Sequence, residues 1–118
     1  MSFINKKGKT SSWRKMVIRQ QVSDVIAYGQ IKTTITKAKE TQKHVDTIIT
    51  LAKDNTLASD RKMHSIFLKT ATRDVDQLVK KAHTIAKKYE NRKGGYTRVV
   101  RIDERDGDNT TVAVLQLV

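Results

Sequence analysis

The sequence predicts a two-layer α+β domain in the order α-β-α-α-α-β-β, with a small three-stranded sheet packed on helices. Three observations lead to this prediction. Four segments carry apolar residues at helical spacing, three short segments are rich in β-branched residues, and no repeat or linker divides the 118 residues. A chain of this length supports one modest hydrophobic core. We therefore expect a basic extended arm at 1–10 and a single domain at 11–118.

The first third of the chain predicts a helix and a strand after the arm. Ser11 and Ser12 are good N-caps, because a hydroxyl can accept from a free backbone N–H at the helix start. A helix to about residue 27 follows, because its apolar residues share one face: Ile18, Val22, Val25 and Ile26. Trp13 and Met16 fall opposite that face. Gly29 is a natural helix stop, and the β-branched run 30–35 alternates as a strand does.

Three more helices are expected between residues 34 and 89. Thr34 or Thr36 caps the first of them, which runs to about Lys53 and buries a stripe made of Val45, Ile48, Ile49 and Ala52. After a turn at 54–55, a helix over 57–69 presents Met63, Ile66 and Phe67. Thr72 can cap the last helix, whose apolar residues keep helical spacing: Val75, Leu78, Val79, Ala82, Ile85, Ala86 and Tyr89.

The last part of the chain predicts a β-hairpin. Residues 91–95 end the helix, since they include Gly94 and Gly95. The runs 96–102 and 110–118 are rich in β-branched residues, and a turn-forming segment at 103–109 joins them.

The charge is strongly positive and uneven. Twenty-four Lys and Arg against twelve Asp and Glu give a net charge of +12 and a pI near 10.1. Residues 1–23 hold no acid, residues 87–101 hold one, and acidic residues gather at 103–108. Such polarity suits a surface that lies along phosphates better than a uniformly solubilising coat, so we expect a nucleic-acid partner.

Composition excludes several classes of protein. The absence of cysteine rules out disulfides, thiolate metal sites and a cysteine nucleophile. Apolar runs are far shorter than the ~20 residues of a membrane span, and the first residues lack a signal-peptide pattern. We expect a soluble, cytoplasmic protein with no membrane contact.

Catalytic patterns are missing as well. His44, His64 and His83 fall on three different predicted helices and form no metal-binding pair. Asp74 and Asp76 suit the first turn of a helix, where acids interact favourably with the dipole. Gly94 and Gly95 match no phosphate-binding loop. We expect no enzyme activity, no cofactor, no metal and no small-molecule substrate.

The residue types favour binding instead. Arginine can grip phosphate with two hydrogen bonds, and the hydroxyls of Thr10, Ser11 and Ser12 lie where a basic arm meets a helix N-terminus. Trp13 and Tyr96 are open to two interpretations, stacking on exposed bases or packing in the core.

Several motifs resemble the bacterial large-subunit ribosomal protein L-seventeen family. Residues 8–15 (GKTSSWRK) resemble its opening G-R-T-S-S-x-R-K, and residues 31–40 (IKTTITKAKE) resemble its I-x-T-T-x-x-K-A-K-E. Residues 94–98 match G-G-Y-T-R, residues 105–108 match R-x-G-D, and the terminal Leu-Val is similar to the usual ending. The motifs keep the family order and span nearly the whole chain. Lys9 stands where the family usually has Arg, and Lys7 where Leu is common.

The resemblance implies an α–β–α₃–β₂ fold and a structural role in the 50S subunit. It implies binding to 23S-type ribosomal RNA near the exit side of the peptide tunnel, with neighbouring large-subunit proteins as further partners. It also implies the absence of catalytic residues and a place in the cytoplasmic ribosome. The expected RNA contacts are Lys6, Lys7, Lys9, Thr10, Ser11, Ser12, Arg14, Lys15, Arg19, Lys37, Lys39, Arg92, Lys93 and Arg98.

Other functions stay open at this point. The main alternative is a free nucleoid-type DNA-binding protein, although no helix-turn-helix or β-ribbon arm is evident. An RNA-modifying enzyme would need a convergent site, and a membrane-surface protein would need an unused apolar helix face. For the binding role, changing Arg14, Lys15 and Arg19 together to Gln is expected to weaken RNA association and leave thermal unfolding nearly unchanged.

Overall fold

The computed structural model describes residues 11–104 and 111–118 and confirms the expected fold class. The predicted arm at 1–10, with Lys6, Lys7, Lys9 and Thr10, lies outside the described residues, as does the hairpin turn at 105–110. The elements are α1 (Ser11–Tyr28), β1 (Gln30–Thr34), α2 (Ile35–Asp54), α3 (Leu57–Ile66), α4 (Val75–Lys88), β2 (Thr97–Glu104) and β3 (Thr111–Leu117).

The sheet has the strand order β1-β3-β2, and both pairings are antiparallel. Residue pairs such as Ile31 with Leu115, and Val99 with Leu115, define the register. The pairing of β2 with β3 shifts between Arg101 and Asp103, so a bulge interrupts the edge strand there. Strand β3 is the central strand of the sheet, because it pairs with both β1 and β2.

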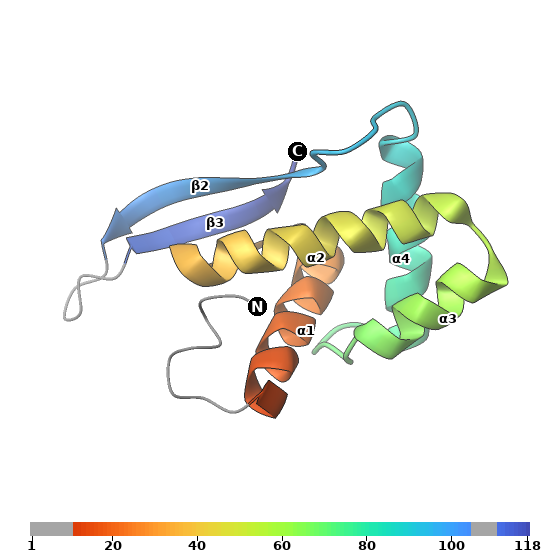
Figure 1. Cartoon of the computed structure of the whole chain (residues 1–118), viewed down its shortest axis with the longest axis horizontal. Coiled ribbons are helices and arrows are strands. Elements are labelled where there is room, and N and C mark those ends of the chain that lie inside the picture. The colour runs from red at the N-terminus through yellow and green to blue at the C-terminus, as the bar shows by residue number, and fades with distance from the viewer. Residues whose placement is uncertain (1–10, 105–110) are drawn as a thin grey trace.

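The inner face of the sheet packs on the helices. In Figure 1, α2 runs beneath β2 and β3, while α3 and α4 lie towards its far end. Helix α2 contacts every other element, because its long buried stripe meets the sheet on one side and the helices on the other. Ala113 and Leu115 of β3 are fully buried against this layer. The core also contains Ile18, Val22, Val25, Ile26, Val45, Ile48, Ile49, Met63, Phe67, Leu78, Val79 and Ile85.

The outer face of the sheet is defined by alternation of side chains along the strands. Residues paired across the strands share a face, so the outer face consists of Gln30, Lys32, Thr34, Arg98, Val100, Val112, Val114 and Gln116.

The apolar spacing in helix α1 is confirmed. Its predicted stripe is buried, while Trp13 and Met16 on the opposite side are 38% and 48% exposed. Gly29 follows the helix with φ of +86°, a left-handed conformation that favours glycine. Its N–H donates to the Val25 carbonyl, which closes the helix end.

Two predicted helix boundaries are wrong. Helix α3 ends at Ile66 and not at residue 69, because Phe67 takes an extended conformation that buries its ring in the core. Helix α4 is capped by Asp74 and not by Thr72. The Asp74 carboxylate accepts from the Gln77 N–H, and the Gln77 side chain accepts from the Asp74 N–H. This reciprocal capping box fixes the start of the helix.

The other caps agree with expectation only in part. Thr34 occupies the N-cap position of α2, but its side chain makes no capping hydrogen bond. Helix α1 already begins at Ser11, so Ser11 and Ser12 belong to its first turn rather than to the cap. The strands cover Gln30–Thr34, Thr97–Glu104 and Thr111–Leu117, within two residues of the predicted bounds.

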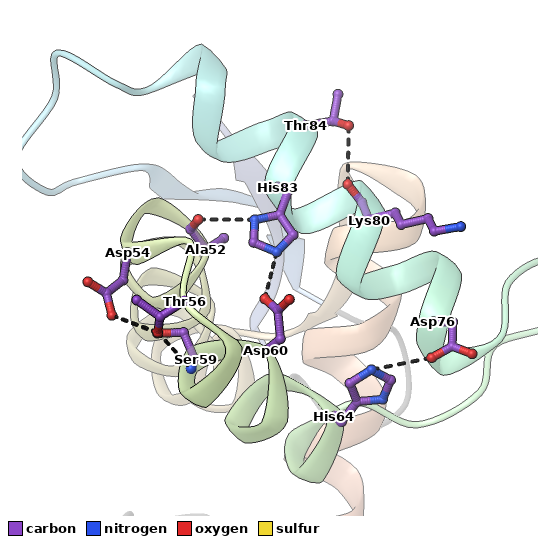
Figure 2. A network of polar contacts seen from close by, with 10 residues as sticks. All are labelled: Ala52, Asp54, Thr56, Ser59, Asp60, His64, Asp76, Lys80, His83 and Thr84. Atoms are coloured by element: carbon purple, nitrogen blue, oxygen red, sulfur yellow. Dashed lines mark hydrogen bonds and ion pairs between the residues drawn. The ribbon is translucent and has the colours of Figure 1, made fainter.

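Polar side chains join α2, α3 and α4 where the three helices meet (Figure 2). His83 of α4 reaches the Ala52 carbonyl with Nδ1, at 3.1 Å, and the Asp60 carboxylate with Nε2, at 2.7 Å. The Ser59 and Thr56 hydroxyls both donate to the Asp54 carboxylate. Helix α3 is short and buries little apolar surface of its own. These polar contacts fix it against its neighbours.

Candidate nucleic-acid interface

The first group of predicted RNA contacts gathers where α1 and α2 begin. We call Arg14, Lys15, Lys37 and Lys39 the α1–α2 basic surface. Lys15 and Lys39 are exposed, and Arg14 and Lys37 are half-buried. The Lys37 ammonium lies 5.6 Å from the centre of the Trp13 ring, which places the two helix starts side by side.

Polar side chains hold this surface in place from beneath. The Gln21 amide donates to the Thr33 hydroxyl at 3.1 Å, and its oxygen accepts from the buried Thr41 hydroxyl at 2.6 Å. These bonds link α1 to β1 and α2. The cations of the α1–α2 basic surface therefore project from a fixed scaffold rather than from separate helices.

Trp13 packs at the surface and not in the core. Its side chain is 38% exposed and lies beside exposed Ser12 and Lys15. The core-packing interpretation is wrong for this residue, because the apolar stripe of α1 lies on the opposite side of the helix.

Arg19 has an internal role that the sequence prediction missed. Its Nε donates to the carbonyl of Ile66 at 2.9 Å, at the C-terminal end of α3, where a positive charge also interacts favourably with the helix dipole. The guanidinium thus joins α1 to α3. Changing Arg14, Lys15 and Arg19 together also removes this tertiary contact, so the structure gives a reason to expect some loss of thermal stability in that variant.

The second group of predicted contacts lies between α4 and β2. We call Lys87, Lys88, Arg92 and Lys93 the α4–β2 basic surface. All four side chains are exposed. Lys87 and Lys88 fill the last turn of α4, where cations stabilise the helix end. These two residues were not among the predicted contacts, although the run of basic residues from 87 to 93 indicates them.

An anchor around half-buried Lys53 positions the backbone of this surface. The Lys53 ammonium donates both to the Arg92 carbonyl and to the Tyr96 hydroxyl, the latter at 2.7 Å, and it lies 4.5 Å from the Tyr96 ring centre. The Tyr96 hydroxyl in turn donates to the Arg92 carbonyl at 3.1 Å. Arg92 is therefore held by its carbonyl while its guanidinium faces solvent.

Tyrosine packing completes the anchor. Tyr96 is 2% exposed, so the core interpretation is confirmed for this residue, and its ring contacts Tyr89 at 5.4 Å between centres. Burial raises the pKa of Tyr89, whose hydroxyl donates to the Val118 carbonyl. The Val118 N–H donates to the Tyr96 carbonyl, which ties the α4–β2 connection to the end of β3.

One acidic group lies beneath this connection. The Asp46 carboxylate of α2 accepts from the Thr97 hydroxyl at 3.1 Å. Burial raises the pKa of Asp46 more than its hydrogen bonds with Thr97 and the Tyr96 backbone lower it. The carboxylate contacts the start of β2 and forms no ion pair with the exposed cations of the α4–β2 basic surface.

Most exposed cations have no carboxylate partner among the described residues. In that part of the chain, Lys43 pairs with Glu40, and three further contacts join a carboxylate to the ring of His44, His64 or His83. Lys39, Lys87, Lys88 and Lys93 therefore keep their charge available. Lys43 lies one turn after Lys39 on the same exposed side of α2, but its ammonium is paired with Glu40 at 3.8 Å.

The two basic surfaces lie far apart. In Figure 1 the start of α1 is at the bottom and the α4–β2 connection is at the top right. The molecule extends 45 × 29 × 28 Å. Arg98 belongs to neither surface, because it lies on the outer face of the sheet. Two separate sites can therefore contact two different segments of one large polyanion.

Within residues 11–104 and 111–118, no cluster of three His, Asp or Glu side chains is placed to hold a metal ion. None of the helices in those residues combines the length and the apolar composition that a bilayer span requires.

Comparison with known proteins gives a consistent result. A family model described as ribosomal protein L17, the L-seventeen proteins, matches residues 17–118. A Malacoplasma penetrans protein named large ribosomal subunit protein bL17 is 63% identical over 119 residues, which cover 100% of both chains. Proteins of the same name from Ureaplasma parvum and Mycoplasma pneumoniae are 60% and 52% identical. The Ureaplasma match covers 100% of both chains, and the Mycoplasma match covers 99% of this chain and 95% of the relative.

Proposed function

The chain belongs to the ribosomal protein L17 family, and from this premise we propose that it binds 23S-type ribosomal RNA through its two basic surfaces. The family consists of structural constituents of the large ribosomal subunit and is not an enzyme family. The protein accordingly acts in the ribosome, in the cytoplasm. Its finer role is to stabilise the fold of the RNA near the exit side of the peptide tunnel, beside neighbouring large-subunit proteins.

The observation that carries the proposal is the pair of basic surfaces that hydrogen bonds hold to the folded body. Among the described residues, their exposed cations Lys39, Lys87, Lys88 and Lys93 form no ion pair with a carboxylate. Packed RNA segments repel each other through their phosphates, and fixed cations lower that repulsion. The α1–α2 basic surface and the α4–β2 basic surface lie on opposite sides of one folded body, so each can neutralise a different segment. The protein then holds the two RNA segments at a fixed distance and also neutralises part of their phosphate charge.

The anchor around Lys53 favours this architectural role. A flexible basic loop would lose conformational freedom on binding, at about 1–2 kcal/mol per residue fixed. The Arg92 carbonyl is already held by Lys53 and Tyr96 in the free protein. Binding therefore orders few further residues, so little of the favourable free energy of phosphate contact is offset by lost conformational entropy.

Sedimentation of the protein with ribosomal subunits tests the proposal. Cell lysate is separated on a sucrose gradient before and after a high-salt wash, and the chain is followed by immunodetection. Retention on the large subunit through the wash is expected. Release into the free fractions, or migration with chromosomal DNA, would overturn the proposal in favour of the free nucleoid-type DNA-binding protein.

Charge-matched variants test the surface itself. Arg92→Gln with Lys93→Gln removes two charges from the α4–β2 basic surface, and Arg61→Gln with Lys62→Gln removes two exposed charges from α3. The first pair is expected to lower the salt dependence of RNA binding by about 1.4–1.8 in log–log slope, at ~0.7–0.9 per phosphate contact. The second pair should leave the slope nearly unchanged. Equal effects of the two pairs would show that net charge alone governs binding.

A further inference from the structure

The outer face of the sheet has an aliphatic centre that the basic surfaces do not explain. Val100 of β2 is 42% exposed and pairs with half-buried Val114 of β3. Half-buried Val112 follows on the same strand, and Ile102, at the bulge, is 51% exposed. Solvent-facing strand positions in antiparallel sheets usually carry polar side chains, so this run of β-branched residues is unusual for a free surface.

No described element covers this face. Helix α2 packs on the inner face, where Ala113 and Leu115 are buried, and Figure 1 shows no helix of the described residues on the other side of β2 and β3. Val100, Val112 and Val114 of this face, and the exposed Ile102 of the bulge, are also absent from the buried core, whereas Ile31, Val99 and Leu117 of the inner face pack against it. Within residues 11–104 and 111–118, the outer face is thus an apolar surface on which no helix or strand packs.

The chemistry of this face favours protein over RNA. Sheet faces that bind RNA stack bases on aromatic rings, but Tyr89 and Tyr96 are buried and the outer face has only aliphatic and polar side chains. An aliphatic centre with a polar rim is the usual anatomy of a protein–protein interface.

The rim adds a charge requirement. Arg98, Gln116 and Gln30 form one row across the three strands, next to the row of Val100, Val114 and Lys32. With the Gln116 amide oxygen towards the guanidinium, Arg98 donates to it from Nε at 2.7 Å and from Nη2 at 3.0 Å. These two bonds orient the Arg98 guanidinium over the sheet. Its other terminal nitrogen, Nη1, stays available to donate to an acceptor.

We propose that the outer face of the sheet docks an apolar segment of a neighbouring protein, with a carboxylate of that segment bound to Arg98. Lys32 at the opposite edge attracts a second acidic group. The inference rests on the proposed place in the large subunit, because the partner is a protein held beside this one by the shared RNA. It replaces the RNA contact predicted for Arg98 with a protein contact.

Site-specific photocrosslinking in assembled subunits tests the inference. A benzoyl-phenylalanine is placed at Val100 of the full chain in cells, large subunits are isolated and irradiated, and the products are identified by mass spectrometry. We expect a crosslink to a peptide of another large-subunit protein that contains aliphatic residues and an Asp or Glu. A crosslink to RNA, to a second copy of this chain or to a peptide without an acidic residue would overturn the inference, and so would the absence of any crosslink.

A second set of variants tests the surface chemistry. With the crosslinker at Val100, Val114→Thr keeps the β-branched shape and Arg98→Gln removes the charge. Each is expected to lower the crosslink yield at least fivefold, while Leu57→Thr, at an exposed apolar position of α3, leaves the yield unchanged. Unchanged yields in both outer-face variants would refute the docking chemistry. Co-sedimentation of the chain with the large subunit is read in the same samples, so failure of the proposed function is seen separately.

Discussion

Replacement of Tyr96 by phenylalanine separates the position of the α4–β2 basic surface from its charge. The substitution removes one hydroxyl, which accepts from Lys53 and donates to the Arg92 carbonyl. The ring, its 5.4 Å contact with Tyr89 and every cation remain. Any effect on RNA binding must therefore come from a loosened backbone around Arg92.

The stability cost follows from the bonds that are lost. Lys53 keeps its bond to the Arg92 carbonyl, so neither group becomes wholly unpaired, and we expect a loss of about 1–2 kcal/mol in the free energy of unfolding. For a domain of this size the melting temperature should fall by about 4–8 °C. Tyr28→Phe is the matched control, because the Tyr28 side chain is 50% exposed and its hydroxyl makes a single 3.3 Å contact with Thr72.

RNA binding is then measured as a function of salt concentration. We expect Tyr96→Phe to weaken affinity about three- to tenfold with an unchanged salt slope, because no phosphate-binding cation is removed. Tyr28→Phe should leave both quantities as they are. A reduced slope in Tyr96→Phe, or an unchanged affinity despite the lower melting temperature, would refute the view that the anchor positions the surface for binding.

Three further predictions concern the fold. His83→Ala should lower the free energy of unfolding by about 1–3 kcal/mol in chemical denaturation, because Asp60 and the Ala52 carbonyl both lose a partner, whereas exposed His44→Ala should change it little. Burial raises the pKa of Asp24 above 3.8, so its carboxylate costs stability at neutral pH and this cost fades as the pH falls through the folded-state pKa. Asp24→Asn should thus be more stable than the wild type at pH 7 and equal to it near pH 3 in thermal unfolding; a gain that persists at pH 3 would contradict this. Gly29→Ala should cost about 1–2 kcal/mol through its positive φ alone, since no atom lies within 4 Å of the added Cβ, while Gly94→Ala should be neutral or slightly stabilising.

The order of elements could be predicted because it depends on local periodicity. The buried stripes of α1 and α4 repeat every three to four residues, and such spacing is visible within a short window of sequence. Caps were harder, since Thr72 and Asp74 are both acceptable N-caps and the choice depends on the reciprocal bond from Gln77. Thr34 similarly occupies a cap position without making the expected bond.

The site was only partly predictable because its positioning contacts are distant in sequence. Arg19 meets the Ile66 carbonyl across 47 residues, and Lys53 meets Tyr96 across 43. Basic clusters mark where cations are abundant, but they do not distinguish a cation that faces solvent from one that joins two helices. The strand order also has no local signal, since β1 pairs with a strand about eighty residues later in the chain.

The central place of β3 has a consequence for how the protein is made. Strands β1 and β2 are both synthesised earlier, yet neither pairs with the other, and each requires residues 111–117 as its partner. During translation the helices can associate before β3 is made, and until then the backbone groups of the two edge strands have no strand partner. Sheet formation is therefore a late event that depends on long-range contacts, which slow folding. A nascent chain that stalls before residue 111 is expected to expose both strands to chaperones, proteases and other stalled chains.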